Sequence, residues 1–177
     1  MKFIASKLLI SAALVAPVAC QAAPAVSLLL GNGENGDIQG VVLIPYEDFW
    51  QKELAQNSGK FAARIEFSAA RIQGDPKAPG GEATVIGVTP VLRYEPSNKL
   101  LYAEFGIGAN YFSQREITSR KSVGTHFEFG DLIGFGIRLG EKKEVEIGYR
   151  FIHYSNAGMS SNNPGLDFHQ IRLQLGF

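Results

Sequence analysis

Cysteine is almost missing from this sequence, since its 177 residues contain only Cys20. That residue lies in an apolar N-terminal stretch, beside the small residues Ala22 and Ala23, in a pattern typical of a secretory signal peptide. We expect residues 1–22 to form this signal peptide, with cleavage near 22/23, and residues 23–177 to form one domain. The mature chain then has no cysteine, which excludes disulfides and thiolate metal sites.

Long basic runs and long apolar runs are also lacking. Basic and acidic residues number 17 each, and no basic run is longer than the pair Lys142 and Lys143. A nucleic-acid partner is therefore excluded, because phosphate backbones need a basic stripe. The apolar stretch from Leu8 to Val18 is shorter than the roughly 20 residues that a helix needs to span a bilayer.

The sequence does contain regular alternation. After the leader it divides into segments of about ten residues in which apolar and polar side chains alternate, separated by clusters of Gly, Pro, Asn, Asp and Lys. No segment of useful length has helical periodicity. The pattern predicts eight strands, at about residues 25–32, 37–46, 61–73, 84–95, 99–112, 125–139, 143–155 and 167–177.

The two faces of these strands differ in character. In the segment 99–112 one face is apolar and the other carries charge and glycine, with Leu101, Ala103, Phe105, Ile107, Ala109 and Tyr111 opposed to Tyr102, Glu104, Gly106, Gly108 and Asn110. A soluble β-sandwich buries its apolar face, whereas a membrane barrel turns it to lipid and fills its interior with polar groups. Export without cysteines, mid-strand charges of both signs and the terminal Phe177 favour the barrel.

We therefore predict an all-β fold, an eight-stranded antiparallel transmembrane β-barrel located in the outer membrane of a Gram-negative cell. Eight strands leave an interior that side chains fill, so a transport channel is excluded. With both termini in the periplasm, the outer connections fall near residues 33–36, 74–83, 113–124 and 156–166. On the periplasmic side, the long connection 47–60 predicts a short interfacial helix over residues 48–56.

The candidate active site lies near the outer end of the seventh predicted strand. His153 and Ser155 are two residues apart, so both side chains leave from one face, which by parity is the lipid face. Asp167 falls on the same face of the next strand at a similar height. Ser155 as nucleophile, His153 as base and Asp167 as orienting acid are the groups that acyl transfer requires. Asn156 is predicted to provide an oxyanion-hole donor, through its side chain or its backbone N–H.

An ordinary interpretation stays open, because His, Ser and Asp are also at ease at the water-facing rim of a barrel. Other polar residues suggest less: His126 is expected in a loop or the lumen, His169 as a supporting or interfacial group, and Asp131 in a structural hydrogen bond or a bulge. A polar group at Asn32, Glu34, Asn35 and Asp37 superficially suggests calcium, but these are first of all turn residues. No metal and no cofactor is expected.

The string His153-Tyr154-Ser155-Asn156-Ala157-Gly158, followed by Gly165 and an acid at 167, resembles the active-site segment of the lipid A 3-O-deacylase (PagL) family. The resemblance extends more loosely to Phe105–Gly108 and Phe129–Gly134.

This resemblance implies an eight-stranded outer-membrane barrel that hydrolyses the ester-linked 3-hydroxyacyl chain at position 3 of lipid A. It implies a triad of His153, Ser155 and Asp167, and a part for Asn156 in the oxyanion hole. The family pattern usually has Glu where this chain has Asp167, which is one methylene shorter, so we expect a small shift of strand or loop.

The implied partner is lipid A, or lipopolysaccharide, in the outer leaflet; the sequence leaves a homodimer open. Two other functions are kept as alternatives. One is a phospholipase-like barrel enzyme that acts on glycerophospholipids. The other is a non-enzymatic barrel that serves adhesion or envelope integrity through its loops.

Overall fold

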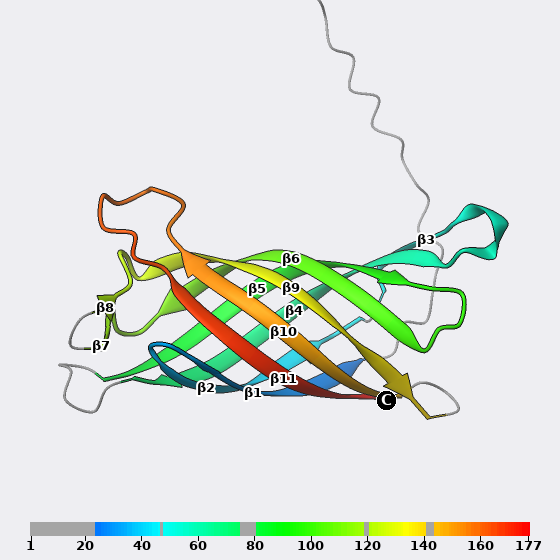
Figure 1. Cartoon of the computed structure of the whole chain (residues 1–177), viewed down its shortest axis with the longest axis horizontal. Helices are drawn as coiled ribbons and strands as arrows, with labels where there is room; N and C mark the ends of the chain where they lie inside the picture. Colours follow the sequence, from blue (N-terminus) through cyan, green and yellow to red (C-terminus); the bar gives the residue numbers. More distant parts are fainter. Residues whose placement is uncertain (1–23, 47, 75–80, 119–120, 141–143) are drawn as a thin grey trace, which may run out of the picture.

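A closed β-barrel makes up the protein in the computed structural model (Figure 1). The structure describes residues 24–46, 48–74, 81–118, 121–140 and 144–177. The predicted signal peptide lies outside these residues.

Eight long antiparallel strands form the wall of the barrel, in agreement with the prediction. Each strand pairs with its neighbours along the chain, and β1 pairs with β11 to close the sheet. The observed bounds lie within two residues of the predicted ones: β1 (Ala25–Gly33), β2 (Gly36–Ile44), β4 (Lys60–Gln73), β5 (Glu82–Glu95), β6 (Leu101–Phe112), β9 (Phe127–Leu139), β10 (Val145–Ser155) and β11 (Leu166–Gly176).

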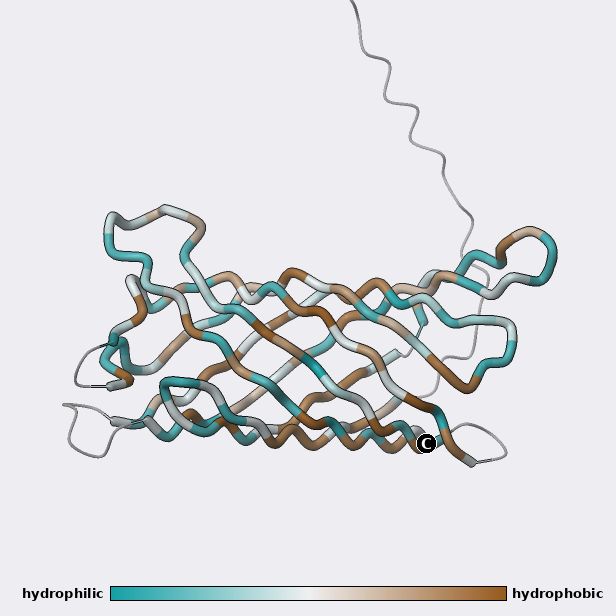
Figure 2. Tube along the Cα trace, in the orientation of Figure 1, coloured by the Kyte–Doolittle hydropathy of each residue, from teal (hydrophilic) through white to brown (hydrophobic). Residues whose placement is uncertain are grey.

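The outer surface of this wall is apolar. Side chains alternate between outside and inside along every long strand, and the outward set includes Leu30, Ile86, Phe105 and Ile133, all more than half exposed. Figure 2 shows this alternation as changes of colour along each strand. An apolar outside around a charged inside is the arrangement of a barrel that spans a membrane. Within the described residues, no helix is long and apolar enough to cross a membrane.

Arginine and glutamate side chains fill the middle of the barrel. Arg150 donates two hydrogen bonds to Glu66, at 2.7 and 2.8 Å, and one to Glu104 at 2.6 Å. Arg93 donates to Glu146 at 2.6 and 2.9 Å. Buried charges are stable only when paired in this way, which explains why both signs occur at mid-strand positions.

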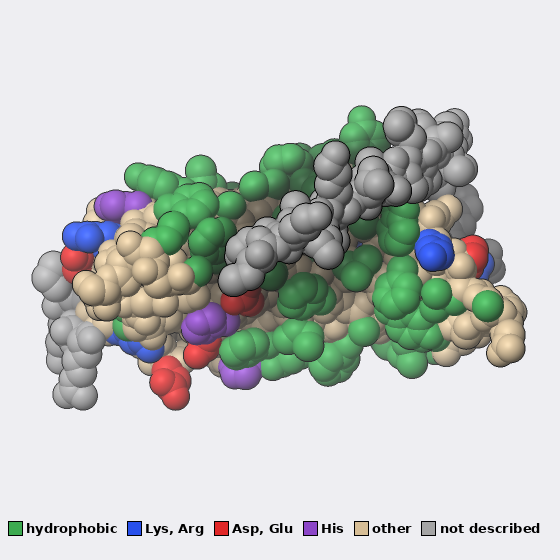
Figure 3. All heavy atoms as spheres, turned by 90° about the horizontal axis from the view of Figure 1, so that it is seen from above, with side chains coloured by type: hydrophobic (Ala, Val, Ile, Leu, Met, Phe, Trp, Pro, Cys, Tyr) green, Lys and Arg blue, Asp and Glu red, His purple; other side chains and the backbone are tan. Residues whose placement is uncertain are grey.

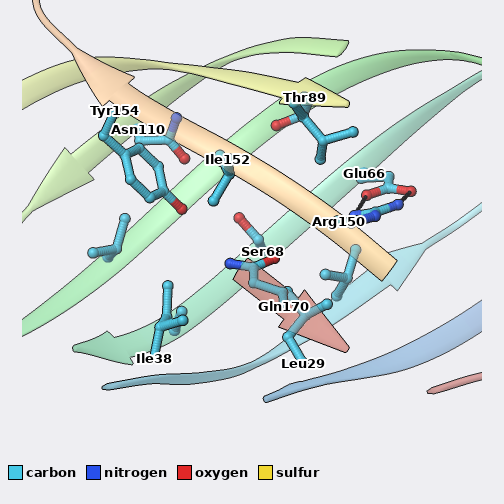
Figure 4. Close-up of a pocket in the computed structure, with 14 residues that line it drawn as sticks. Leu29, Ile38, Glu66, Ser68, Thr89, Asn110, Arg150, Ile152, Tyr154 and Gln170 are labelled. Carbon is cyan, nitrogen blue, oxygen red and sulfur yellow. Dashed lines mark hydrogen bonds and ion pairs between the residues drawn. The ribbon is translucent and has the colours of Figure 1, made fainter. Parts of the chain in front are cut away.

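A cavity of about 20 Å³ lies beside this network, between Tyr154 and Asn110 at one end and the Arg150–Glu66 pair at the other (Figure 4). Such a cavity holds about one water molecule. Nearer the long loops, a buried cluster of apolar side chains fills the barrel, formed chiefly by Phe112, Ile117, Val123, Tyr154, Leu166 and Phe168.

The opposite end of the barrel corrects one prediction. Residues 48–56 do not form an interfacial helix: β3 (Trp50–Glu53) pairs with the start of β4, and a 3₁₀ turn, η1 (Ala55–Asn57), joins the two. Both Gln56 and Asn57 have positive φ angles, which a helix does not tolerate. The segment therefore extends the sheet beyond the barrel instead of lying along the membrane.

The long connections lie at the other end, which we call the loop end. The connection between β6 and β9 contains a small hairpin, β7 (Glu116–Thr118) and β8 (Lys121–Ser122). At the same end, β1 and β2 are joined by a tight turn at residues 34–35. Apart from this turn and the long segment 45–59 at the opposite end, the connections follow the pattern of outer-membrane barrels, whose longer loops face the outside.

Candidate functional site

His153 and Asp167 face each other across two neighbouring strands near the loop end. They are register partners on β10 and β11, and both side chains point out of the barrel. Nδ1 of His153 lies 2.5 Å from Oδ1 of Asp167, in hydrogen-bond contact. The two side chains are 40% and 52% exposed, so the pair lies open on the wall. The strands keep regular register here, and the aspartate carboxylate reaches the imidazole across it.

A second carboxylate flanks the same histidine. Asp131 on β9 is the other register partner of His153 and also points outward. The register of β9 is regular at this position, so the predicted bulge is absent. Among the described residues the Asp131 carboxylate has no hydrogen-bond partner, and the structural bond expected for it is likewise not found. The geometry thus selects Asp167, and not Asp131, as the partner of the imidazole.

Ser155 is the last residue of β10 and lies on the same outward face as His153. Its register partner on β9 is Phe129, an aromatic residue of the outer wall. Because Nδ1 of His153 is bound to Asp167, Nε2 is the ring nitrogen left to exchange a proton with a hydroxyl group. The outer wall therefore carries a serine, an imidazole and a carboxylate on one face, and of these groups the imidazole and the carboxylate are in hydrogen-bond contact.

Asn156 organises the loop that follows Ser155. It is fully buried; its backbone N–H donates to Oδ1 of Asn163 at 2.9 Å, and its Nδ2 donates to the Asn162 carbonyl at 2.9 Å. Its Oδ1 accepts the backbone N–H of Gly158 at 3.0 Å. The backbone N–H and the side-chain Nδ2 are the two donors that the sequence predicted for an oxyanion hole. In this geometry both hold the loop, and only the second hydrogen of Nδ2 has no partner in these contacts.

Gly165 is a site residue whose role sequence reasoning missed, although it belongs to the recognised motif. Its φ is +64°, a left-handed conformation that favours glycine. A Cβ at this position would lie 2.7 Å from Cε1 of His153 and 3.4 Å from Nε2. The backbone of residue 165 therefore limits where the imidazole ring can lie. A glycine two residues before the candidate acid was the available signal.

The strands under the site are held from inside the barrel. Tyr154 alternates with His153 and Ser155 on β10, and its ring packs edge-on against Phe112 at 5.2 Å. Leu166 and Phe168, which flank Asp167 on β11, belong to the same buried cluster. A packed apolar cluster therefore supports the backbone that carries the three polar groups.

The remaining histidines lie elsewhere. His126 lies in the loop before β9, which is one of the two positions predicted for it. Its Nδ1 is 2.7 Å from the Phe112 carbonyl oxygen. His169 points outward from β11 and contacts the hydroxyl of Tyr149 at 2.5 Å, so it does not support the triad directly. Figure 3 shows histidine and acidic side chains gathered on one face, bordered by hydrophobic ones. No group of three or more candidate metal ligands is found in the described parts of the chain.

Comparisons with known proteins place the chain in a family. A family model described as lipid A 3-O-deacylase (PagL) matches residues 41–176. Lipid A deacylase PagL of Bordetella bronchiseptica is 31% identical over 144 residues, covering 80% of this chain and 79% of that protein. The protein of the same name from Pseudomonas aeruginosa is 28% identical over 125 residues, covering 69% of each chain.

A solved structure agrees with these matches. The crystal structure of the outer membrane enzyme PagL superimposes with a TM-score of 0.72 and 25% identity, covering 86% of this chain and 99% of that one. The family match runs from the second half of β2 to the end of β11 and thus includes His153, Ser155 and Asp167. The chain therefore belongs to the lipid A 3-O-deacylase (PagL) family.

Proposed function

We propose that this protein is an outer-membrane esterase that removes the ester-linked 3-hydroxyacyl chain from position 3 of lipid A, with Ser155, His153 and Asp167 as its triad. The observation that carries the proposal is the 2.5 Å contact between His153 and Asp167 on the lipid-facing wall, two residues from Ser155. Membership of the family supports ester hydrolysis and lipid A as the substrate.

The chemistry follows from the order of the three groups. Ser155 Oγ attacks the ester carbonyl carbon while Nε2 of His153 takes its proton. As the bond between the carbonyl carbon and the sugar oxygen breaks, the imidazolium returns that proton to the sugar oxygen. Water then attacks the acyl-serine with the same base and releases the hydroxy acid. Asp167 holds the imidazole and stabilises its charged form.

The oxyanion of each tetrahedral intermediate needs a donor. We keep Asn156 in this role through the second hydrogen of its Nδ2, which is the one that its loop contacts leave over. Because this side chain is fully buried, a small displacement of the loop around it would accompany substrate binding. One copy of the chain supplies every group that the proposed reaction needs.

An open site on the wall suits a substrate that is itself part of the membrane. Phe129 and Ile107 lie on the β9–β6 side of Ser155 and His153, and both belong to the outward apolar face. An acyl chain can lie along this face while the bilayer holds the ester at the height of the loop end. The site needs no deep pocket, because the membrane concentrates and orients the substrate.

Mass spectrometry of lipid A tests the proposal. Lipid A from cells that express the wild-type protein should lose the mass of one 3-hydroxyacyl chain, and lipid A from cells that express His153→Asn should not. Purified protein should release 3-hydroxy acid from lipid A and no fatty acid from glycerophospholipids. Release from glycerophospholipids would favour the phospholipase alternative, and unchanged masses with both lipids would favour a non-enzymatic barrel.

Two changes at Asp167 separate its charge from its length. Asp167→Asn should lower kcat by about 10²- to 10⁴-fold, because an amide does not stabilise the imidazolium. Asp167→Glu should keep most of the activity, since the carboxylate can reach Nδ1 from the same outward position. Steady-state release of 3-hydroxy acid measures both. Equal kcat values for the two variants would remove Asp167 from the mechanism.

Gly165→Ala tests the space that the imidazole needs. The new Cβ would press on Cε1 of His153, and a displaced base should cost roughly 10- to 100-fold in kcat/KM. Gly158→Ala is the matched control, because Gly158 also has a positive φ, of +81°, but a Cβ there meets nothing within 4 Å. Both changes should cost about 1 kcal/mol of stability through backbone strain. Equal losses of activity in the two variants would show that strain, and not contact with His153, is responsible.

A further inference from the structure

A hollow of mixed lining lies beside the proposed triad on the outer wall, where β10, β11, β1 and β2 meet. Its volume is about 360 Å³; Leu30 and Ile171 supply apolar surface, and the polar side chains of Asn32, Asp37, Tyr149 and His169 lie among them. Two other hollows on the outer wall, around Phe49, are lined almost entirely by apolar residues. The hollow is thus a local exception to the apolar surface that the barrel turns to lipid.

Register places its polar groups in one row. His169 pairs with Asn32, and Asn32 pairs with Asp37, so the three outward residues occupy neighbouring strands at one height. His169 is only two residues from Asp167 on the same face of β11. The hollow therefore begins where the triad ends.

The groups that line the hollow are fixed or unpaired. The ring of His169 is held by the Tyr149 hydroxyl, 2.5 Å from its Nδ1, and it packs against Phe151 at 5.3 Å, which leaves Nε2 free. In the described part of the chain, the side chains of Asn32 and Asp37 make no hydrogen bond. Both side chains are exposed, so their hydrogen-bonding groups are available to a polar ligand on the outer wall.

The chemistry of the lining selects the ligand. The Asp37 carboxylate accepts hydrogen bonds from hydroxyl groups, and the Asn32 amide and the His169 imidazole can both donate to them and accept from them. No Lys or Arg lines the hollow, and the Asp37 carboxylate repels phosphate. The tight turn at residues 34–35 lies next to Asn32 and Asp37, so the hollow is close to the level of lipid headgroups.

From this arrangement we infer that the hollow binds the sugar hydroxyl groups of the glycolipid substrate, through Asn32, Asp37 and His169. This inference rests on the proposed function and adds the orientation of the substrate on the barrel wall. The sugar lies over β11, β1 and β2, and the acyl chain to be removed lies over β9 and β6, so that the ester crosses Ser155. The hollow then distinguishes a sugar-based lipid from a glycerol-based one.

Equilibrium binding in the Ser155→Ala background tests the subsite without turnover. The probes are a diacylated glucosamine lipid and a diacylglycerol lipid with the same chains, each fluorescently labelled and added to protein in detergent micelles. Loss of two hydrogen-bonding groups in Asn32→Leu/Asp37→Leu should weaken binding of the glucosamine lipid about ten-fold. Binding of the diacylglycerol lipid should not weaken. Gln39→Leu, an outward polar residue of β2 outside the hollow, is the control and should change neither affinity.

The outcomes separate the subsite from the reaction. Equal affinities of the double variant and its parent for the glucosamine lipid would overturn the subsite, as would a parallel loss for both lipids. His169→Phe keeps an aromatic ring at this position but removes both ring nitrogens, and it should weaken binding of the glucosamine lipid only. This single variant guards against a folding defect in the double variant. If wild-type protein bound the glucosamine lipid through these residues but released no acid, the esterase proposal alone would fail.

Discussion

Replacement of Ser155 by alanine is expected to reduce kcat for release of the 3-hydroxy acid by at least about 10³-fold, with KM little changed. Alanine removes the proposed nucleophile, but it leaves unchanged the outer wall on which the lipid is proposed to lie. Oγ also makes no hydrogen bond with any described residue, so the variant should fold with unchanged stability. The measurement is steady-state hydrolysis of purified lipid A in mixed micelles, together with thermal unfolding.

Ser161→Ala provides a matched control. Ser161 lies exposed in the same loop, away from the paired strands, so its loss should leave kcat within about two-fold of the wild-type value. If Ser155→Ala retained more than a tenth of the wild-type rate, the nucleophile would have to be another group. A water molecule activated by His153 would then be the simplest replacement.

The largest effect on stability is expected from Arg150→Met. Arg150 is 2% exposed and donates hydrogen bonds to both Glu66 and Glu104. Methionine has a similar length but no charge, so it would leave two buried carboxylates with one cation fewer. Breaking a buried ion pair from one side costs about 3–5 kcal/mol of folding free energy. Denaturant unfolding in detergent or lipid measures this loss.

An ion pair on the outside of the same barrel gives the comparison. Arg71 and Glu82 contact each other at 2.5 Å, but their side chains are 50% and 55% exposed. Arg71→Met should therefore cost less than about 1 kcal/mol. The double variant Arg150→Met/Glu66→Gln should recover part of the loss, because it removes one of the stranded charges. Similar losses for Arg150→Met and Arg71→Met would mean that the interior is more hydrated than its packing indicates.

Strand parity made most of the fold predictable. A period of two separates the faces of a strand so strictly that the outward direction of His153, Ser155 and Asp167 follows from sequence once the strand is recognised. The charges of Arg64, Glu104 and Arg150 then fall inside the barrel, where they pair. The boundaries of the strands were less predictable, because turn residues such as Gly33 and Gly36 can also pair with each other and lengthen the two strands.

Contacts between strands were not predictable in the same way. Both Asp131 and Asp167 flank His153, and only the rotamers decide which carboxylate binds its ring. The part of Asn156 in the loop depends on Asn162 and Asn163, whose positions no periodicity determines. The segment 48–56 has composition that suits a membrane interface, but pairing with the start of β4 satisfies its backbone better than a helix interrupted at Gln56.

The filled barrel described above determines the route by which material leaves the proposed site. Arginine–glutamate pairs occupy its middle and an apolar cluster closes its loop end, so neither product can escape through the centre. The freed fatty acid has to diffuse sideways among the surrounding lipids, while the shortened glycolipid stays in its leaflet. A cell could thus remodel its surface with this enzyme and keep its permeability barrier intact.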